Sequence, residues 1–155
     1  MDVEIEHKYL VNISEWNKVR AAEKVQIRQG YLQTDPNKTI RVRTKGEQGF
    51  ITIKGKAVGA SRLEFEYEIP LADANELLDK FCSNLVEKVR NYVVHDHKTW
   101  EVDVFTGLNA GLIVAEIELG SEEETYSLPS WVADNVTKDV KYANSNLAVT
   151  PFIQW

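Results

Sequence analysis

Charged side chains recur at every second position in several short segments of this sequence. In a β-strand this spacing places them on one face, because successive side chains point to opposite sides. The segment EIEHKY at positions 4–9 is the first example, and RVR, TIK, LEFEYEI, EKVR and AEIEL follow the same pattern. The charged positions in these segments are Glu4, Glu6, Lys8, Arg41, Arg43, Lys54, Glu64, Glu66, Lys88, Arg90, Glu116 and Glu118. The residues between them are mostly apolar, so each segment predicts a strand with one charged face and one apolar face.

The charges are grouped by sign, and this grouping indicates bound ions. Glutamates at alternate positions, such as Glu64 and Glu66, repel each other unless a cation lies between them. Arg41 and Arg43 on one face likewise indicate an anion with several oxygens. For any single strand, a charged face that meets solvent is the simpler explanation, but it does not account for the whole set. A polyphosphate bound together with a divalent metal would satisfy both groups of charges.

Eight segments with strand-like alternation must position these side chains. They cover residues 2–11, 25–34, 38–46, 49–57, 62–70, 84–94, 98–107 and 110–120. We predict an α+β, mainly β fold, in which a closed eight-stranded antiparallel β-barrel forms a tunnel with a polar, charged lumen. Helical spacing at 14–23 and 71–81 predicts two helices packed outside, against the apolar faces. Glu101 and Asp103 extend the charged rows; Glu101 is expected at a solvent-exposed rim, whereas Asp103 fits a rim or the lumen about equally well.

The final part of the chain carries weaker signals. Residues 121–129 are acidic and loop-like, 130–136 predict a single helical turn, and 141–148 predict a short helical tail that covers part of the barrel. No linker, internal repeat or low-complexity segment divides the sequence. Residues 1–155 are therefore predicted to form a single domain.

Composition excludes several classes of partner. The net charge of −6 argues against nucleic acid and anionic membranes, both of which attract an excess of Lys and Arg. No apolar stretch approaches the roughly 20 residues that cross a bilayer. Cys82 is the only cysteine, so no intramolecular disulfide can form, and a reducing compartment is the simpler expectation. We therefore expect a cytoplasmic protein.

The ordered set of motifs resembles the CYTH superfamily, also called triphosphate tunnel metalloenzymes, and in particular its small bacterial members. EIEHK matches the Glu-x-Glu-x-Lys signature of that family, and RVR, TIK, LEFEYEI, EKVR, EVDVF, AEIEL and YANSNLA follow in family order. The resemblance covers nearly the whole chain. It implies a closed eight-stranded tunnel whose substrates share a triphosphate group.

The resemblance also implies roles for the charged residues. The residues expected to bind the triphosphate are Lys8, Arg41, Arg43, Lys54, Lys88 and Arg90. The residues expected to hold Mg²⁺ or Mn²⁺, directly or through water, are Glu4, Glu6, Glu64, Glu66, Glu116 and Glu118. Water attacking the terminal phosphorus could be activated by a metal-bound carboxylate, for which Glu4, Glu6 and Glu118 are the candidates. The alternative is a Lys and Tyr pair, for which Lys88 and Tyr31 are the candidates. The expected catalytic residues are Lys8, Lys88, Tyr31 and Glu6.

Three functions remain open at the level of sequence. Hydrolysis of inorganic triphosphate leads, because the chain has little extra sequence with which to recognise a base or RNA. A class IV adenylate cyclase, which converts ATP to cyclic AMP and diphosphate, is the first alternative, and a non-catalytic polyphosphate- or nucleotide-binding module is the second. A lipocalin-like carrier is disfavoured because its lumen should be apolar. The expected partner is a small-molecule triphosphate, with no nucleic acid and no membrane, and a homodimer stays open.

Overall fold

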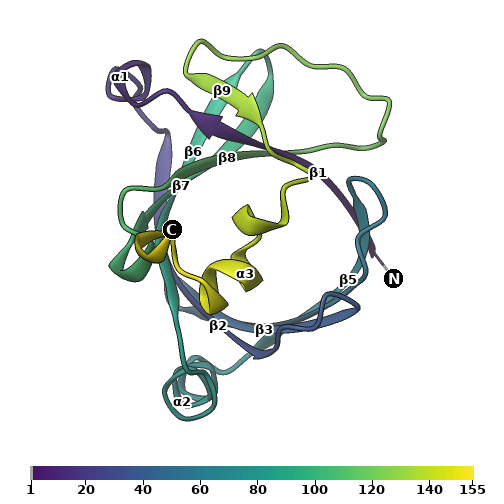
Figure 1. Ribbon diagram of the computed structural model, residues 1–155, viewed down its shortest axis with the longest axis vertical. Coiled ribbons are helices and arrows are strands. Elements are labelled where there is room, and N and C mark those ends of the chain that lie inside the picture. Colours follow the sequence, from purple (N-terminus) through teal and green to yellow (C-terminus); the bar gives the residue numbers. More distant parts are fainter. Residues whose placement is uncertain (1) are drawn as a thin grey trace.

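Eight antiparallel strands close into a barrel in the computed structural model, which describes residues 2–155 (Figure 1). The strands are β1 (Asp2–Val11), β2 (Glu23–Gln33), β3 (Lys38–Lys45), β4 (Gln48–Gly55), β5 (Ser61–Ile69), β6 (Val86–His95), β7 (Lys98–Thr106) and β8 (Ile113–Glu118). Around the barrel they follow the order β5-β4-β3-β2-β6-β7-β8-β1, and pairing of β1 with β5 closes the ring. All eight strand predictions and the closed barrel are confirmed.

Tight turns hold neighbouring strands in register. The hairpin between β6 and β7 turns at Asp96 and His97, which have φ angles of 50° and 65°. Two consecutive residues with positive φ are typical of the two-residue turns whose twist matches that of antiparallel strands. Gly46, with φ of 60°, serves the same purpose between β3 and β4. Register is therefore fixed locally, and the charged side chains of adjacent strands are brought to one face.

A ninth strand, β9 (Val132–Asn135), pairs with the end of β1. The predicted helical turn at 130–136 is therefore wrong. β5 pairs only with the first residues of β1, up to Ile5, so the later part of β1 would have an open edge on that side. β9 occupies this edge, opposite Tyr9 and Val11. The open edge, rather than any propensity of the short segment, explains the extended conformation.

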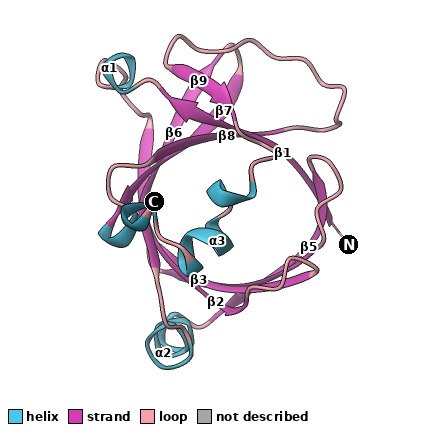
Figure 2. Ribbon diagram, in the orientation of Figure 1, coloured by secondary structure: helices cyan, strands magenta, loops and turns pink. Residues whose placement is uncertain are grey.

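The helices outside the barrel are α1 (Ile13–Trp16) and α2 (Leu71–Phe81) (Figure 2). α2 has the predicted bounds, and it buries Ala74 and Leu78 against the outer wall. α1 is much shorter than the predicted helix at 14–23. The Asn12 side chain accepts a hydrogen bond from the backbone of Glu15 and caps its first turn, but the chain leaves the helix at Asn17. The apolar side chains that suggested a longer helix pack on the barrel from irregular backbone.

The C-terminal segment lies across one end of the barrel (Figures 1 and 2). It contains α3 (Asn144–Val149) and the short 3₁₀ helices η2 (Val140–Tyr142) and η3 (Phe152–Gln154); a further one, η1 (Gly107–Asn109), connects β7 and β8. Leu147 and Ala148 are buried against Val86, Phe105 and Val114 from the inner face of the barrel. The prediction of a short helical tail that covers part of the barrel is confirmed.

The other apolar clusters lie outside the barrel wall. One forms around Trp100 and Trp131, which pack on Tyr9 and Ile117, and the second joins α2 to β3 at Val42. Burial of these outer faces supplies most of the apolar stabilisation. We call the C-terminal segment from η2 to η3, which closes one end of the barrel, the plug. The rest of the inner face carries mostly polar and charged side chains. Within residues 2–155, no helix is long and apolar enough to cross a membrane.

Candidate active site

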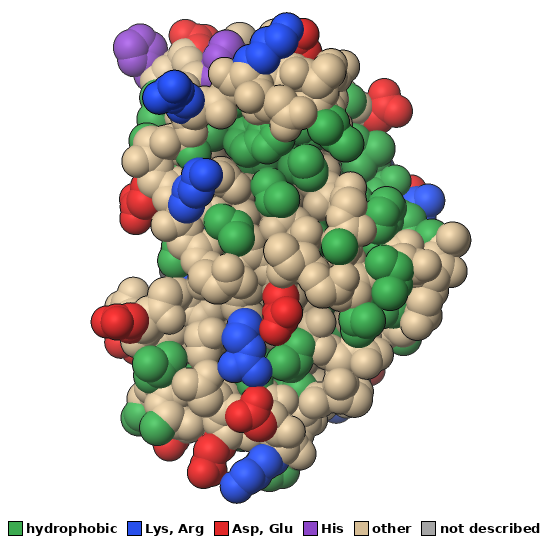
Figure 3. Space-filling view, turned by 90° about the vertical axis from the view of Figure 1, so that its left-hand side faces the viewer, with side chains coloured by type: hydrophobic (Ala, Val, Ile, Leu, Met, Phe, Trp, Pro, Cys, Tyr) green, Lys and Arg blue, Asp and Glu red, His purple; other side chains and the backbone are tan. Residues whose placement is uncertain are grey.

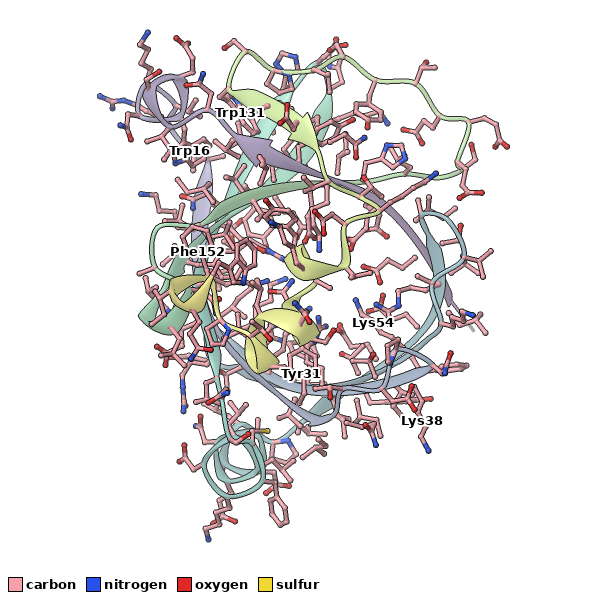
Figure 4. The ribbon with its side chains drawn as sticks, in the orientation of Figure 1. Trp16, Tyr31, Lys38, Lys54, Trp131 and Phe152 are labelled. Atoms are coloured by element: carbon pink, nitrogen blue, oxygen red, sulfur yellow. The ribbon has the colours of Figure 1, made fainter. Side chains whose placement is uncertain are left out.

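The barrel encloses a cavity of about 550 Å³ whose lining is almost entirely charged. Its lining residues are Val3, Glu4, Glu6, Arg41, Arg43, Lys45, Lys54, Glu64, Glu66, Lys88, Arg90, Glu101, Glu116, Glu118 and Asn144. Eleven of the twelve charged positions singled out in the sequence are among them, and Lys8 is the exception. Figure 4 shows Lys54 directed into the ring, whereas Trp16 and Trp131 lie outside it. The alternating charges therefore converge on one space, as predicted.

Arg41 and Arg43 share a single carboxylate. Nη2 of Arg41 lies 3.5 Å from Glu66 Oε2, and Nη2 of Arg43 lies 3.3 Å from the same oxygen. Thr52 Oγ1 donates to this oxygen over 3.0 Å and accepts from Arg41 over 3.2 Å. Nε of each arginine is buried and has no hydrogen-bond partner in the part of the chain that the structure describes. Buried, unused N–H groups are costly unless an acceptor binds, so this wall is organised to receive an anion.

The crowding of positive charge also changes the acidity of Arg43. Burial, together with the neighbouring charges of Arg41 and Arg90, lowers the pKa of Arg43 to about 10. Glu66 opposes this shift but does not cancel it. Its guanidinium also lies over the Phe50 ring, 5.9 Å from the centroid. The charge of Arg43 is thus unfavourable beside Arg41 and Arg90, and a bound anion would offset this.

Lys88 and Arg90 make stronger contacts than the sequence indicated. Asp103 is fully buried and accepts from Nε and Nη2 of Arg90 over 2.8 and 3.0 Å. Lys88 Nζ lies 2.8 Å from Asp103 Oδ2, and Arg90 Nη1 lies 2.9 Å from Glu101 Oε2. Burial alone would raise the pKa of Asp103, but these two cations hold it well below its usual range. Asp103 therefore belongs to the lumen, where it positions both cations, and Glu101 lines the cavity instead of a solvent-exposed rim.

Lys88 has a lowered pKa, so it loses its positive charge more easily than an exposed lysine does. Burial lowers the pKa of its ammonium to about 8, and the adjacent Arg90 contributes in the same direction. Asp103 and Glu116 act against this shift. Asn144 Oδ1 accepts a hydrogen bond from Lys88 Nζ over 3.1 Å, so the C-terminal tail also contacts this lysine. At neutral pH Lys88 is charged, and it loses its proton in mildly alkaline solution.

Three carboxyl groups gather beside Lys54. Lys54 Nζ lies 2.9 Å from Glu4 Oε2, and Glu4 interacts in turn with Glu6 and Glu64. Burial and the hydrogen bond with Glu4 raise the pKa of Glu64 to about 7. Burial and the charges of Glu116 and Glu4 raise the pKa of Glu6 well above its usual range. Burial, together with the neighbouring acids, therefore favours the protonated forms of Glu6 and Glu64, whereas Lys54 holds the pKa of Glu4 below its usual range.

A divalent cation fits these donors chemically. No three His, Cys, Asp or Glu side chains within residues 2–155 already stand in a metal-binding arrangement. Carboxylate oxygens are nevertheless the ligands that Mg²⁺ and Mn²⁺ prefer. Burial and neighbouring acids raise the pKa values of Glu6 and Glu64, so negative charge on these two carboxyl groups is unfavourable without a nearby cation. A cation at this point would relieve that repulsion.

Lys8 lies at the closed end of the barrel and does not line the open cavity. Its Nζ is 3.6 Å from Glu116 Oε1 and donates to the Tyr142 carbonyl over 3.4 Å. Burial alone would lower the pKa of Lys8, but Glu116 and Glu6 raise it. Glu118, on the same face of β8 as Glu116, is exposed. The row of acids on β8 thus runs from the plugged end to the open mouth.

Tyr31 is also placed at the closed end. Its hydroxyl accepts a hydrogen bond from Gln29 Nε2 over 2.8 Å, and its ring packs with the plug residues. Burial raises the pKa of this phenol. Among residues 2–155, Tyr31 does not line the cavity and makes no hydrogen bond to Lys88. The geometry brings Lys88 into the cavity but does not pair it with Tyr31.

Four lining residues lie outside the twelve charged positions: Val3, Lys45, Glu101 and Asn144. Lys45 follows Arg41 and Arg43 at the same spacing on β3, so the alternation itself could have identified it. Its Nζ lies over the Tyr92 ring, 5.7 Å from the centroid. Asn144 had no such signal, because it reaches the lumen from α3 and not from a strand.

A second groove, of about 650 Å³, lies outside the wall beside α1. Figure 3 shows hydrophobic side chains gathered over the upper half of one outer face. Residues that line the groove include Trp16, Val19 and Val89, together with the cations Arg20 and Lys24. Its lining contains no Asp or Glu, so it lacks the carboxylate ligands that the lumen offers. The lumen is the better candidate for chemistry.

A closed antiparallel barrel with both signs of charge in its lumen defines a tunnel protein for polyanions. The CYTH domain model matches residues 2–148, and the chain belongs to the CYTH family, as the motifs predicted. An inorganic triphosphatase of Acetivibrio thermocellus is 43% identical over 153 residues, which cover 98% of this chain and 97% of that protein. An inorganic triphosphatase of Nitrosomonas europaea is 34% identical over 151 residues, covering 95% and 97%.

Solved structures agree with this assignment. A crystal structure of an inorganic triphosphatase superposes with a TM-score of 0.67 at 32% identity and covers 96% of each chain. A Pyrococcus horikoshii protein shares the fold at a TM-score of 0.59 and 21% identity, covering 77% of this chain and 81% of its own. Triphosphatases of the CYTH family are metal-dependent enzymes.

Proposed function

We propose that this protein hydrolyses inorganic triphosphate to phosphate and diphosphate in the barrel lumen, with Mg²⁺ or Mn²⁺ as cofactor. The observation that carries the proposal is the pair Arg41 and Arg43, whose Nε groups are buried without acceptors beside a cluster of carboxyl groups. A triphosphate would supply acceptors to the two arginines, and a divalent cation would supply positive charge to the carboxyl groups. Relatives of nearly the same length are inorganic triphosphatases.

The cavity lining favours an inorganic substrate over a nucleotide. Val3 and Asn144 are the uncharged residues of the lining, and none of the lining residues within 2–155 is aromatic. A purine or a thiazole ring is usually held by stacking on an aromatic side chain or by apolar contacts. The site offers phosphate ligands on most sides and no platform for a ring. This favours inorganic triphosphate over ATP, and hydrolysis over cyclic AMP formation.

The chemistry is phosphoryl transfer to water, in which positioning and electrostatics contribute most of the rate. Arg41 and Arg43 orient the phosphoryl oxygens, and Lys54 and Lys88 add positive charge. Lys8, at the closed end, acts on the lumen through Glu116. These fixed charges stabilise negative charge on the transferred group without reorganising.

The acids have two roles in this proposal. Glu4, Glu6 and Glu64 would hold the metal ion, with Glu66, Glu116 and Glu118 as further carboxylates in the lumen. When bound, the metal supplies a Lewis acid that polarises phosphate oxygens. Glu6, in its carboxylate form, would take the proton of the attacking water. Tyr31 has no role in this scheme, since it does not line the cavity.

The test is phosphate release from inorganic triphosphate, ATP and thiamine triphosphate, with Mg²⁺, with Mn²⁺ and with a chelator. We expect metal-dependent release that is fastest with inorganic triphosphate. Arg41→Ala should lose most of this activity, whereas Lys38→Ala, an exposed cation at the start of the same strand, should keep it. Cyclic AMP from ATP would identify a cyclase, and binding without turnover on any substrate would identify a non-catalytic module. We place this reaction in the cytoplasm, in keeping with the lone thiol of Cys82.

A further inference from the structure

Two buried polar groups of opposite kind belong to neighbouring residues on the inner face of the barrel. Arg43 on β3 and Gln29 on β2 are directly opposite each other in the antiparallel pairing. Their side chains therefore share one face, with Cβ atoms about 4.5–5.5 Å apart. Within residues 2–155, Arg43 Nε–H is a buried donor without an acceptor, and Gln29 Oε1 is a buried acceptor without a donor. Each group thus lacks the partner that the other offers.

The other contact of Gln29 fixes its amide group. Gln29 is completely buried, and its Nε2 donates a hydrogen bond to the Tyr31 hydroxyl over 2.8 Å. The guanidinium of Arg43 carries only donors, which favours the orientation in which the amide nitrogen turns to Tyr31 and the amide oxygen is left for Arg43. Tyr31 in turn packs against the plug. The unused acceptor is therefore held in place from the closed end of the barrel.

Arg43 is held at its other end by a long ion pair. Its Nη2 lies 3.3 Å from Glu66 Oε2, the same oxygen that Arg41 and Thr52 contact. Charge-assisted hydrogen bonds are usually about 2.7–2.9 Å long, so this shared contact is a weak one. A phosphate group offers several acceptor oxygens and can replace Glu66 as the partner of the terminal nitrogens. Arg43 is then free to turn its Nε–H toward Gln29.

We propose that Gln29 is a positioning residue that acts through Arg43. This inference rests on the proposed function, in which Arg43 binds phosphate. When a phosphate group draws the terminal nitrogens of Arg43 from Glu66, Nε–H donates to Gln29 Oε1, and this hydrogen bond fixes the plane of the guanidinium. An arginine held at Nε presents its two terminal nitrogens to a phosphate as a bidentate pair. Anion binding thereby also satisfies two buried groups, which strengthens it.

The test is the affinity for inorganic triphosphate, measured by isothermal titration calorimetry with a chelator that prevents metal-dependent turnover. Gln29→Met keeps a similar volume without the acceptor, and it should weaken binding at least about tenfold, the usual effect of one hydrogen bond to a charged group. In an Arg43→Met background the same substitution should change the affinity by less than about twofold, because its effect passes through Arg43. Gln26→Met is the matched control. Gln26 is exposed on the outer face of the same strand, opposite Val89, so its substitution should leave binding unchanged.

Three results would overturn the inference. Gln29→Met with the affinity of the wild type would do so, as would wild-type protein that binds no triphosphate. An equal loss with and without Arg43 would show that Gln29 only packs. Should Gln29→Met fail to fold, by circular dichroism, Gln29→Leu provides the same comparison with a shorter side chain. Binding without phosphate release would refute hydrolysis and leave the affinity test of Gln29 in force, so the two failures are distinguishable.

Discussion

Arg43→Met should make the protein more stable in the absence of added ligand while it removes most of its activity. Arg43 is buried, shares Glu66 with Arg41, and has an Nε without a hydrogen-bond partner among the residues described. Methionine fills a similar volume with an apolar, flexible chain. The substitution therefore removes a strained charge and leaves the ion pair between Arg41 and Glu66 in place.

The magnitude follows from the acidity of the guanidinium. The pKa of Arg43 falls from 12.5 to about 10 through burial and the nearby cations. At about 1.4 kcal/mol for each pKa unit, its charge costs the empty fold on the order of 3 kcal/mol. Because the pKa of this base is lowered on folding, the cost is complete below pH 10 and disappears between about 10 and 12.5. Loss of the contact with Glu66 offsets about 1 kcal/mol, so a net gain of about 1–2 kcal/mol is expected.

Thermal unfolding without ligand measures the stability, and phosphate release measures the activity. A gain of 1–2 kcal/mol raises the Tm of a chain of this size by roughly 2–8 °C. Loss of a donor to the transferred phosphoryl group should lower kcat/KM by about 10²–10³-fold. Arg90→Met is the control with the opposite sign. It removes two hydrogen bonds from buried Asp103, and breaking such a pair typically costs about 3–5 kcal/mol.

The two substitutions thus compare two cations of the lumen. Arg43 has an Nε without a hydrogen-bond partner among the residues described, whereas Arg90 already donates two hydrogen bonds to Asp103. If Arg43→Met lowered the Tm as much as Arg90→Met does, the guanidinium of Arg43 would be a structural group and the reasoning would fail. Full activity in Arg43→Met would remove it from the phosphate site.

Three further outcomes follow from the cavity. Lys45→Ala should raise KM about tenfold and leave kcat unchanged, because Lys45 lines the cavity and makes no ion pair with an acid within residues 2–155. Steady-state kinetics measures both constants, and an equal loss in kcat would contradict this expectation. The value of kcat/KM should fall above about pH 8, where Lys88 loses its proton; a profile flat to pH 10 would exclude Lys88 from substrate binding. Asn144→Ala should shift that alkaline limit to lower pH, because it removes an acceptor that stabilises the ammonium of Lys88; an unmoved limit would show that Asn144 only packs.

The strands and their facing were predictable because one physical signal determines both. In an inside-out barrel, charged side chains point inward and apolar ones outward, so the alternation of residue types reports strand and face together. The alternation along β3 is one example, since it correctly places three cations in the lumen: Arg41, Arg43 and Lys45. Glu116 and Lys8 likewise face each other because β1 and β8 pair at that register.

Elements that depend on distant contacts were not predictable. β9 is extended because β1 offers an open edge, and its four residues carry no periodicity of their own. α1 ends at Trp16 because the following residues pack on the barrel. Asn144 reaches Lys88 only after the tail has folded across the barrel end. The hydrogen bonds of Asp103 to Arg90 likewise depend on the register of β6 and β7.

The location of the apolar clusters explains how the lumen can hold unfavourable charges. Three apolar clusters stabilise the barrel without any contribution from the open cavity. They lie around Trp100 and Trp131 outside the wall, between α2 and the wall, and around Leu147 at the closed end. The cavity is then free to keep Glu64 with a pKa of about 7 and Arg43 with one of about 10. These shifts have opposite signs, so neither an anion nor a cation alone relieves both. The substrate that best matches these charges is a polyanion bound together with its metal ion.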